Sequence, residues 1–351
     1  MGLTAFILDG ILRAIAPSDE TLDAVRNRRD EVLGVVAPYP GALRTYASGS
    51  VAHRTANDDT DADGGVVLDR RSSPELGPDG GNEGPTDIVE DMRAYLRDAL
   101  RDALKEAHPR IAFRLSKRAI RVTYKEPLAD GTDPTVDLIV ALTRKDGALW
   151  IPNLDRPGWE PSDPECHARL MTAEPATLRR TRAKIVRLAK AWNKQSTQPG
   201  LSAFNITALA LACITERMGV ATGLAEFFTY AAQDLKQRLT PDPANVSPPI
   251  KVLIDRNSVI LRLEHASERM EEALTHDDDE TAVREALSSV YWEYVQPPAG
   301  STSKAAFANI LRSGNAGVGI SGGLIMATPS TVPFKTTRAF GSGHVKGQSD
   351  Q

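Results

Sequence analysis

The sequence predicts an α+β fold in which a front part of mixed helices and strands precedes an all-helical part. Two strand-like runs, AIRVTY at 119–124 and TVDLIVAL at 135–142, flank a polar turn of Pro, Asp and Gly, which is typical of a hairpin. From about residue 175 the apolar residues recur instead at helical spacing. This change of period along one chain predicts a mixed sheet with helices, followed by a helical part.

The front part begins with two expected helices. The first 17 residues are apolar but have no basic leader region and no run of about 20 apolar residues, so we expect an amphipathic helix. Ser18 is a candidate cap for a long helix over 19–36, which ends before Pro38. The stretch 44–68 then indicates strand, loop and strand, 72–86 a surface loop rich in Pro, Gly and Asp, and 87–107 a strong helix.

The back part contains five expected helices and a tail. The helices are expected at 175–194, 203–218, 223–238, 256–275 and 279–294. Beyond residue 296 the composition shifts to Gly, Ser, Thr and Ala with little periodicity, which predicts a partly disordered tail. The sequence therefore predicts three parts, over 1–170, 171–296 and 297–351.

The bulk composition excludes several classes of protein. A formal net charge of −4 gives no strong signal for nucleic acid, because long nucleic acid is held by a basic field. Two cysteines, Cys166 and Cys213, are too few for a disulfide framework or a cysteine-rich zinc site. We expect a cytoplasmic protein with no membrane association.

Three acids carry the chemical signal. Asp61 and Asp63 stand one residue apart beside an apolar run, and on an extended strand this spacing points both carboxylates to one face. Asp137 is a lone acid within TVDLIVAL, where an unpaired buried carboxylate is costly. We predict that the three acids meet on neighbouring strands and bind two Mg²⁺ or Mn²⁺ ions. One ion would activate a hydroxyl, and the other would hold a triphosphate and its leaving pyrophosphate.

The acids by themselves leave an alternative open. Acidic residues before a strand are commonly turn formers, so DDTDAD is also consistent with a solvated loop. Gly49 and Ser50 favour the metal site, because a Gly-Ser turn allows close backbone approach and offers donors to a phosphate. Few unrelated folds would produce by chance the ordered set of a Gly-Ser turn, two spaced acids, an apolar strand and a later acid inside another apolar strand.

This ordered set resembles the polymerase-β-type nucleotidyltransferase superfamily. Further segments are similar to the bacterial cGAS/DncV-like nucleotidyltransferases (CD-NTases): LWIPN at 149–153, W-x-x-S-D-P-x-x-H at 159–167, IVRLAKAWNK at 185–194 and LSAFNITALAL at 201–211. The resemblance covers roughly residues 40–215. It implies a polymerase-β-like catalytic core with N-terminal helices in residues 1–170, packed on a C-terminal helical domain in residues 171–296 that closes the nucleotide cleft.

The resemblance also implies an activity and its residues. The activity is synthesis of a cyclic di- or trinucleotide from ATP, GTP or other nucleoside triphosphates, with a downstream effector reached through that product in anti-phage (CBASS-type) signalling. The matching positions are Gly49 and Ser50 for phosphate, Asp61, Asp63 and Asp137 for metal and catalysis, and Lys190 and Ser202 for nucleotide.

The neighbours of these positions have their own interpretations. Asp59 stands two residues before Asp61, which leaves a second register for the acid pair; Asp63 directly precedes the apolar run and favours Asp61 with Asp63. The basic residues Arg180, Arg187 and Lys194 are interpreted as a solvated helix face. Trp150, Trp159 and Trp192 are interpreted as packing residues, and Asn205 is a weak candidate for base recognition.

Other functions share the same motifs. A nucleotidyltransferase that modifies a macromolecule, such as a toxin acting on tRNA or protein, would carry the same acids, and so would a nucleotide sensor that has lost activity. For the tail, covalent joining to a conjugating partner is one hypothesis, and an unstructured end is the other.

Overall fold

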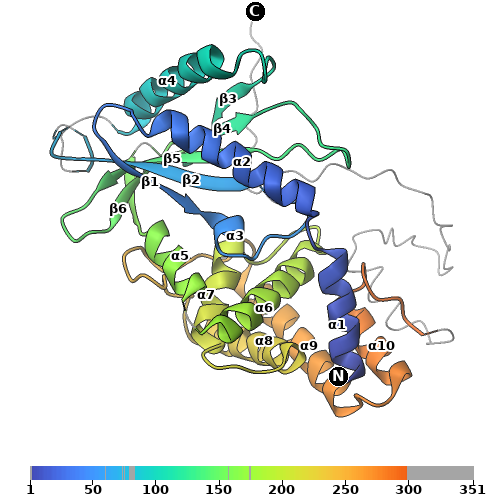
Figure 1. The fold of residues 1–351 in the computed structure, drawn as a ribbon. Helices are drawn as coiled ribbons and strands as arrows, with labels where there is room; N and C mark the ends of the chain where they lie inside the picture. The colour runs from blue at the N-terminus through green and yellow to red at the C-terminus, as the bar shows by residue number, and fades with distance from the viewer. Residues whose placement is uncertain are drawn as a thin grey trace, which may run out of the picture.

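The fold is that of a computed structural model, which describes residues 2–59, 61–72, 74, 76–78, 84–156, 158–173 and 175–298 (Figure 1). The predictions for the tail over 297–351 therefore lie outside the described residues, apart from its first two positions.

A mixed sheet forms the front part. In the described residues its strands are β1 (Ala42–Ser48), β2 (Ala62–Leu68), β3 (Ala112–Leu115), β4 (Ile120–Thr123), β5 (Val136–Thr143), β6 (Leu149–Asn153) and β7 (Gly158–Ser162). Their order is β1-β2-β5-β4-β3, with β6 pairing β5 and β7. The β2–β5 pair is parallel and the other pairs are antiparallel. The predicted α+β class and the β4–β5 hairpin are confirmed, whereas β3, β6 and β7 were not predicted as strands.

Two long helices cover one face of this sheet. Figure 1 places α2 (Asp19–Val36) and α4 (Thr86–Leu104) on the upper side, and their apolar residues share a core with alternate residues of β5. Ser18 caps α2 as predicted, because its hydroxyl accepts the Thr21 N–H at 3.0 Å. Since Val136 and Leu138 point into this core, Asp137 between them faces the opposite side.

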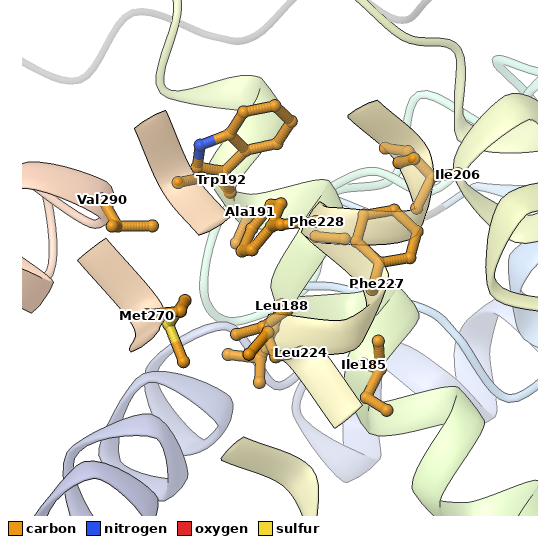
Figure 2. Close-up of a cluster of buried hydrophobic side chains, with 14 of the residues drawn as sticks. Ile185, Leu188, Ala191, Trp192, Ile206, Leu224, Phe227, Phe228, Met270 and Val290 are labelled. Carbon is orange, nitrogen blue, oxygen red and sulfur yellow. The ribbon is translucent and has the colours of Figure 1, made fainter. Parts of the chain in front are cut away.

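The helical part lies on that opposite side. It contains α5 (Pro164–Thr172), α6 (Ala176–Lys194), α7 (Ala203–Cys213), α8 (Val220–Gln237), α9 (Arg256–Thr275) and α10 (Glu280–Val290). The helices predicted at 175–194 and 256–275 match closely; α7 and α10 end earlier than predicted, and α5 was not predicted. A second apolar core fills this part (Figure 2), where the Trp192 ring lies 5.0 Å from that of Phe228, so its packing role is confirmed.

The first helix, α1 (Leu3–Ala14), packs with this second core rather than with the sheet. Leu8 and Ile11 are buried in the helical cluster, and the Thr4 hydroxyl donates to the Ala273 carbonyl at 2.9 Å. The expected boundary at residue 170 groups this helix with the strands, so α1 is the element that departs from that division. None of the described helices is long and apolar enough to cross a membrane.

Candidate active site

A row of side chains crosses the sheet on the face toward the helical part. In the strand register Ser48 of β1 is opposite Asp63 of β2, and Asp63 is opposite Asp137 of β5. The row continues from Asp137 to Arg121 of β4 and from Arg121 to Arg114 of β3. Because directly paired residues project to the same side, the backbone places two of the predicted acids next to each other, with a cation beside them.

Asp63 lies beneath the Gly-Ser turn. The turn is the start of a short helix, α3 (Gly49–Ala52), which follows β1 directly. Gly49 has φ +70°, and a Cβ atom there would lie 1.8 Å from Oδ2 of Asp63. Burial, followed by the charges of Asp137 and Asp61, raises the pKa of Asp63 to about 7. A cation bound beside this carboxylate would favour its ionised form.

The other two acids already have partners. The Thr135 N–H donates to Oδ1 of Asp61 at 3.0 Å, and burial raises the pKa of this carboxyl. Arg121 donates to both oxygens of Asp137, from Nε at 2.8 Å and from Nη2 at 2.7 Å. Among the residues that the structure describes, no three His, Cys, Asp or Glu side chains are grouped as metal ligands.

The residues nevertheless fit divalent cations. Asp63 and Asp137 share one sheet face, the charges of Asp137 and Asp61 both repel that of Asp63, and the Gly49 backbone leaves room for the Asp63 carboxylate. Hard cations such as Mg²⁺ prefer carboxylate oxygens. Asp61, Asp63 and Asp137 are therefore the residues that would hold the ions, once the side chain of Asp137 is released from Arg121.

Lys190 faces the acids from the helical part. It is 7% exposed on α6, and its Nζ donates to the Thr55 carbonyl at 2.9 Å. Burial, then the neighbouring charge of Lys194, lowers the pKa of Lys190 to about 8, while the carboxylates of Asp59 and Asp63 act in the opposite direction. The interaction with Asp63 places a buried ammonium group close to the predicted metal site.

Two further residues of α6 hold the segment 55–59 that leads to the acids. Arg187 donates to Oδ1 of Asn57, and the Asn57 amide donates to the Arg187 carbonyl at 3.2 Å. Lys194 forms an ion pair with Asp59. The interpretation as a solvated face is therefore wrong for Arg187, which is partly buried against this loop, whereas Lys194 is exposed as expected. Asp59 is drawn toward α6 by the same contact.

The predicted nucleotide-binding residues Ser50 and Ser202 and the base-recognition candidate Asn205 lie in different surroundings. Ser50 lies in the first turn of α3, and its carbonyl accepts the Thr55 N–H at 2.8 Å. Ser202 caps α7, since its hydroxyl accepts the Asn205 N–H at 3.0 Å. Asn205 is 0% exposed and accepts a hydrogen bond from the Thr240 hydroxyl, so it has no surface to offer a base. Nucleotide contacts of Ser50 and Ser202 stay predictions.

Sequence reasoning missed Arg121. The available signal was its position on an apolar strand, between Ile120 and Val122, in a hairpin with the strand that carries the lone Asp137. An isolated cation facing an isolated acid across a hairpin indicates a pair. The register that joins them could not be counted from the sequence, because the turn between the strands is long.

His167, from the second family-like motif, has a structural partner. Its Nε2 lies 2.6 Å from Oδ1 of Asp242, whose side chain is fully buried, and its ring packs on Phe204. This contact ties α5 to the segment after α8. A separate cavity of about 370 Å³ lies near Leu170, Arg182 and Tyr230, and none of the predicted site residues lines it.

No protein-family model and no curated protein sequence matches the chain. Solved structures do. CdnC of E. coli MS115-1 with ATP aligns at TM-score 0.60 and 18% identity, over 84% of this chain and 99% of that chain. The CD-NTase CdnG of Bradyrhizobium diazoefficiens with GTP aligns at TM-score 0.58 and 15% identity, over 87% and 97%.

The chain has the CD-NTase fold. Vibrio cholerae DncV, a cyclic AMP-GMP synthase in complex with the linear intermediate pppA(3′,5′)pG, also aligns, at TM-score 0.51 and 15% identity, over 72% of this chain and 69% of that chain. In the CD-NTase fold of this chain, the row of acids and Lys190 lie on facing sides of the junction between the sheet and the helical part.

Proposed function

We propose that this protein is a nucleotidyltransferase that makes a cyclic di- or trinucleotide from nucleoside triphosphates with two divalent cations. The observation that carries the proposal is the pairing of Asp63 with Asp137 across β2 and β5, with the charge of Asp61 acting on Asp63 and the buried Lys190 of α6 interacting with Asp63. The proposal is supported by the fold shared with CdnC, CdnG and DncV, which were solved with ATP, GTP and a linear dinucleotide respectively.

The residues have separate roles in this proposal. Asp61, Asp63 and Asp137 would hold Mg²⁺ or Mn²⁺, which supplies charge for the triphosphate and lowers the pKa of the attacking hydroxyl. Gly49 keeps the backbone clear of Asp63, and the Gly49-Ser50 turn donates to phosphate. Lys190 stabilises the negative charge that develops on the phosphates as the bond to the leaving pyrophosphate breaks. Ser202 would contact the nucleotide from the start of α7.

In this proposal the two parts of the chain contribute different elements of the active site. Residues 1–170 would provide the acids and the turn, and residues 171–296 would close the cleft over the triphosphate. The cytoplasm is the compartment we propose, with an effector reached through the product in anti-phage signalling. The tail is the hypothetical site of a conjugating partner.

The test is product analysis. The purified chain is incubated with four labelled ribonucleoside triphosphates and Mg²⁺ or Mn²⁺, then with phosphatase, beside an Asp61→Ala/Asp63→Ala variant. Asp59→Ala serves as the control for loss of a nearby acid. A phosphatase-resistant product that disappears only in the double variant supports the proposal. Label that moves instead to added RNA or protein would establish the macromolecular-acceptor function.

A further inference from the structure

Arg121 forms an ion pair with Asp137, the third acid of the predicted metal site. Its Nε and Nη2 each donate to a different oxygen of Asp137, at 2.8 and 2.7 Å. The two side chains are 23% and 20% exposed, so solvent screens this pair only in part. A two-bond guanidinium–carboxylate pair with this geometry is among the stronger ion pairs in proteins, because both charge and direction are matched.

The same two oxygens are the ones that a divalent cation would need. Asp137 is in register with Asp63 on one side and with Arg121 on the other, so its carboxylate can be directed toward either neighbour. In the structure both oxygens are directed to the guanidinium, and the described acids form no metal-ligand group.

We propose that Arg121 is a built-in counter-cation which neutralises Asp137 in the metal-free protein and which a divalent ion must displace from that carboxylate. The inference rests on the proposed function, because it assumes that Asp137 is a metal ligand. Arg121 is a positioning residue in this scheme. It keeps three mutually repelling acids compatible with folding before metal arrives, at the expense of metal affinity.

Equilibrium binding of Mn²⁺ to the full chain, without nucleotide, tests the competition. Free Mn²⁺ is measured by electron paramagnetic resonance in wild type, Arg121→Gln and Arg121→Lys. A neighbouring cation shifts carboxylate affinity for a proton by about 1–3 pKa units, so Arg121→Gln should bind Mn²⁺ about tenfold more tightly or better. Arg121→Lys keeps the charge without the two-bond grip and should tighten binding less.

Arg114 provides the matched control. It is the next residue of the row, one strand beyond Arg121, and it is exposed. Arg114→Gln removes the same charge without removing a contact to Asp137, so we expect Mn²⁺ affinity within about twofold of wild type. An equal gain in Arg114→Gln and Arg121→Gln would mean a general charge effect and would overturn the displacement.

A double-variant cycle separates this inference from the proposed function. Asp137→Asn should weaken Mn²⁺ binding. Adding Arg121→Gln to the Asp137→Asn variant should not tighten binding, because the carboxylate that Arg121 neutralises is then absent. If Asp137→Asn weakens binding but Arg121→Gln binds like wild type or worse, the counter-cation is refuted while the metal site stands. If Asp137→Asn has no effect, both fail. Melting temperatures check that each variant folds. Should Arg121→Gln not fold, Arg121→Lys tests the competition instead, because it should still bind Mn²⁺ more tightly than wild type.

Discussion

The Asp63 carboxylate lies so close to the backbone of Gly49 that it leaves no room for a side chain at position 49. A Cβ atom there would lie 1.8 Å from Oδ2 and 2.5 Å from Cγ of the aspartate. Gly49 also has φ +70°, which is unfavourable for residues with a Cβ. The glycine of the turn is therefore required by the acid beneath it, in addition to any role in phosphate approach.

Gly49→Ala should reduce both catalysis and stability. The new methyl group must push the Asp63 carboxylate aside, and a displacement of about 1 Å in an active site costs about 10²-fold in rate. The positive φ adds strain of about 1–2 kcal/mol to the folded state. Initial rates and urea unfolding measure the two effects.

Gly41→Ala is the control for backbone strain. Gly41 has φ +84°, but nothing lies within 4 Å of the position that a methyl group would take there. We expect a similar loss of stability with rates close to wild type. Equal rate losses in the two alanine variants would attribute the effect to strain alone and not to contact with Asp63.

Metal binding should depend on pH through Asp63. Its pKa is raised to about 7, chiefly by burial, so protons compete with cations for this carboxylate below neutral pH. Mn²⁺ affinity should rise from about pH 5.5 to about 8 and level off above. The measurement is a series of binding isotherms in matched buffers; a flat profile across this range contradicts the prediction.

The same shift predicts a gain in stability on removing the charge. Asp63 has a higher pKa folded than unfolded, so its contribution is full below about pH 4 and is lost as pH rises through about 7. Asp63→Asn should therefore stabilise the metal-free protein at about pH 8, on the order of 2 kcal/mol, while abolishing turnover. Thermal melts at about pH 5 and about pH 8 check it, with a clearly larger gain expected at the higher pH.

The fold was predictable to the extent that local patterns determine it. Ser18 and the apolar spacing after it identified α2, and two strand-like runs around a polar turn identified the central hairpin. Strands β6 and β7 were missed because LWIPN and GWEPS are short, interrupted by proline and without alternation.

The site was predictable as a list of acids and not as a set of contacts. Spacing placed Asp61 and Asp63 together, but the pairing of Asp137 with Arg121 depends on strand register, and that of Lys194 with Asp59 on the docking of α6. Such contacts join residues far apart in sequence, and no local propensity encodes them.

Lys190 should contribute through its positive charge. Lys190→Met removes a buried cation that would face the phosphates in the proposed function, and it should lower kcat/KM by about 10²-fold or more. The pKa of Lys190 is lowered to about 8, so kcat/KM of the wild type should fall as pH rises above 8, because the free enzyme loses this charge.

Lys190→Arg is the matched variant for that profile. A guanidinium stays protonated throughout this range, so the alkaline decline should vanish even if the rate at about pH 7 is lower. Rates from about pH 6.5 to about 9.5 provide the comparison. An identical decline in Lys190→Arg would assign the alkaline limb to another group.

Asp59 and Asp61 should behave differently on substitution, which decides the register of the acid pair. Asp59 forms an ion pair with Lys194, and the two side chains are 33% and 35% exposed, so the pair contributes about 1 kcal/mol or less to stability. Asp59→Ala should therefore change rate and Mn²⁺ affinity only a few-fold. Asp61→Ala, which removes a predicted metal ligand, should lower the rate by about 10³-fold or more. Should Asp59→Ala be as inactive as Asp61→Ala while Asp63→Ala stays active, the metal pair is Asp59 with Asp61, and Asp63 is a buried residue of the strand.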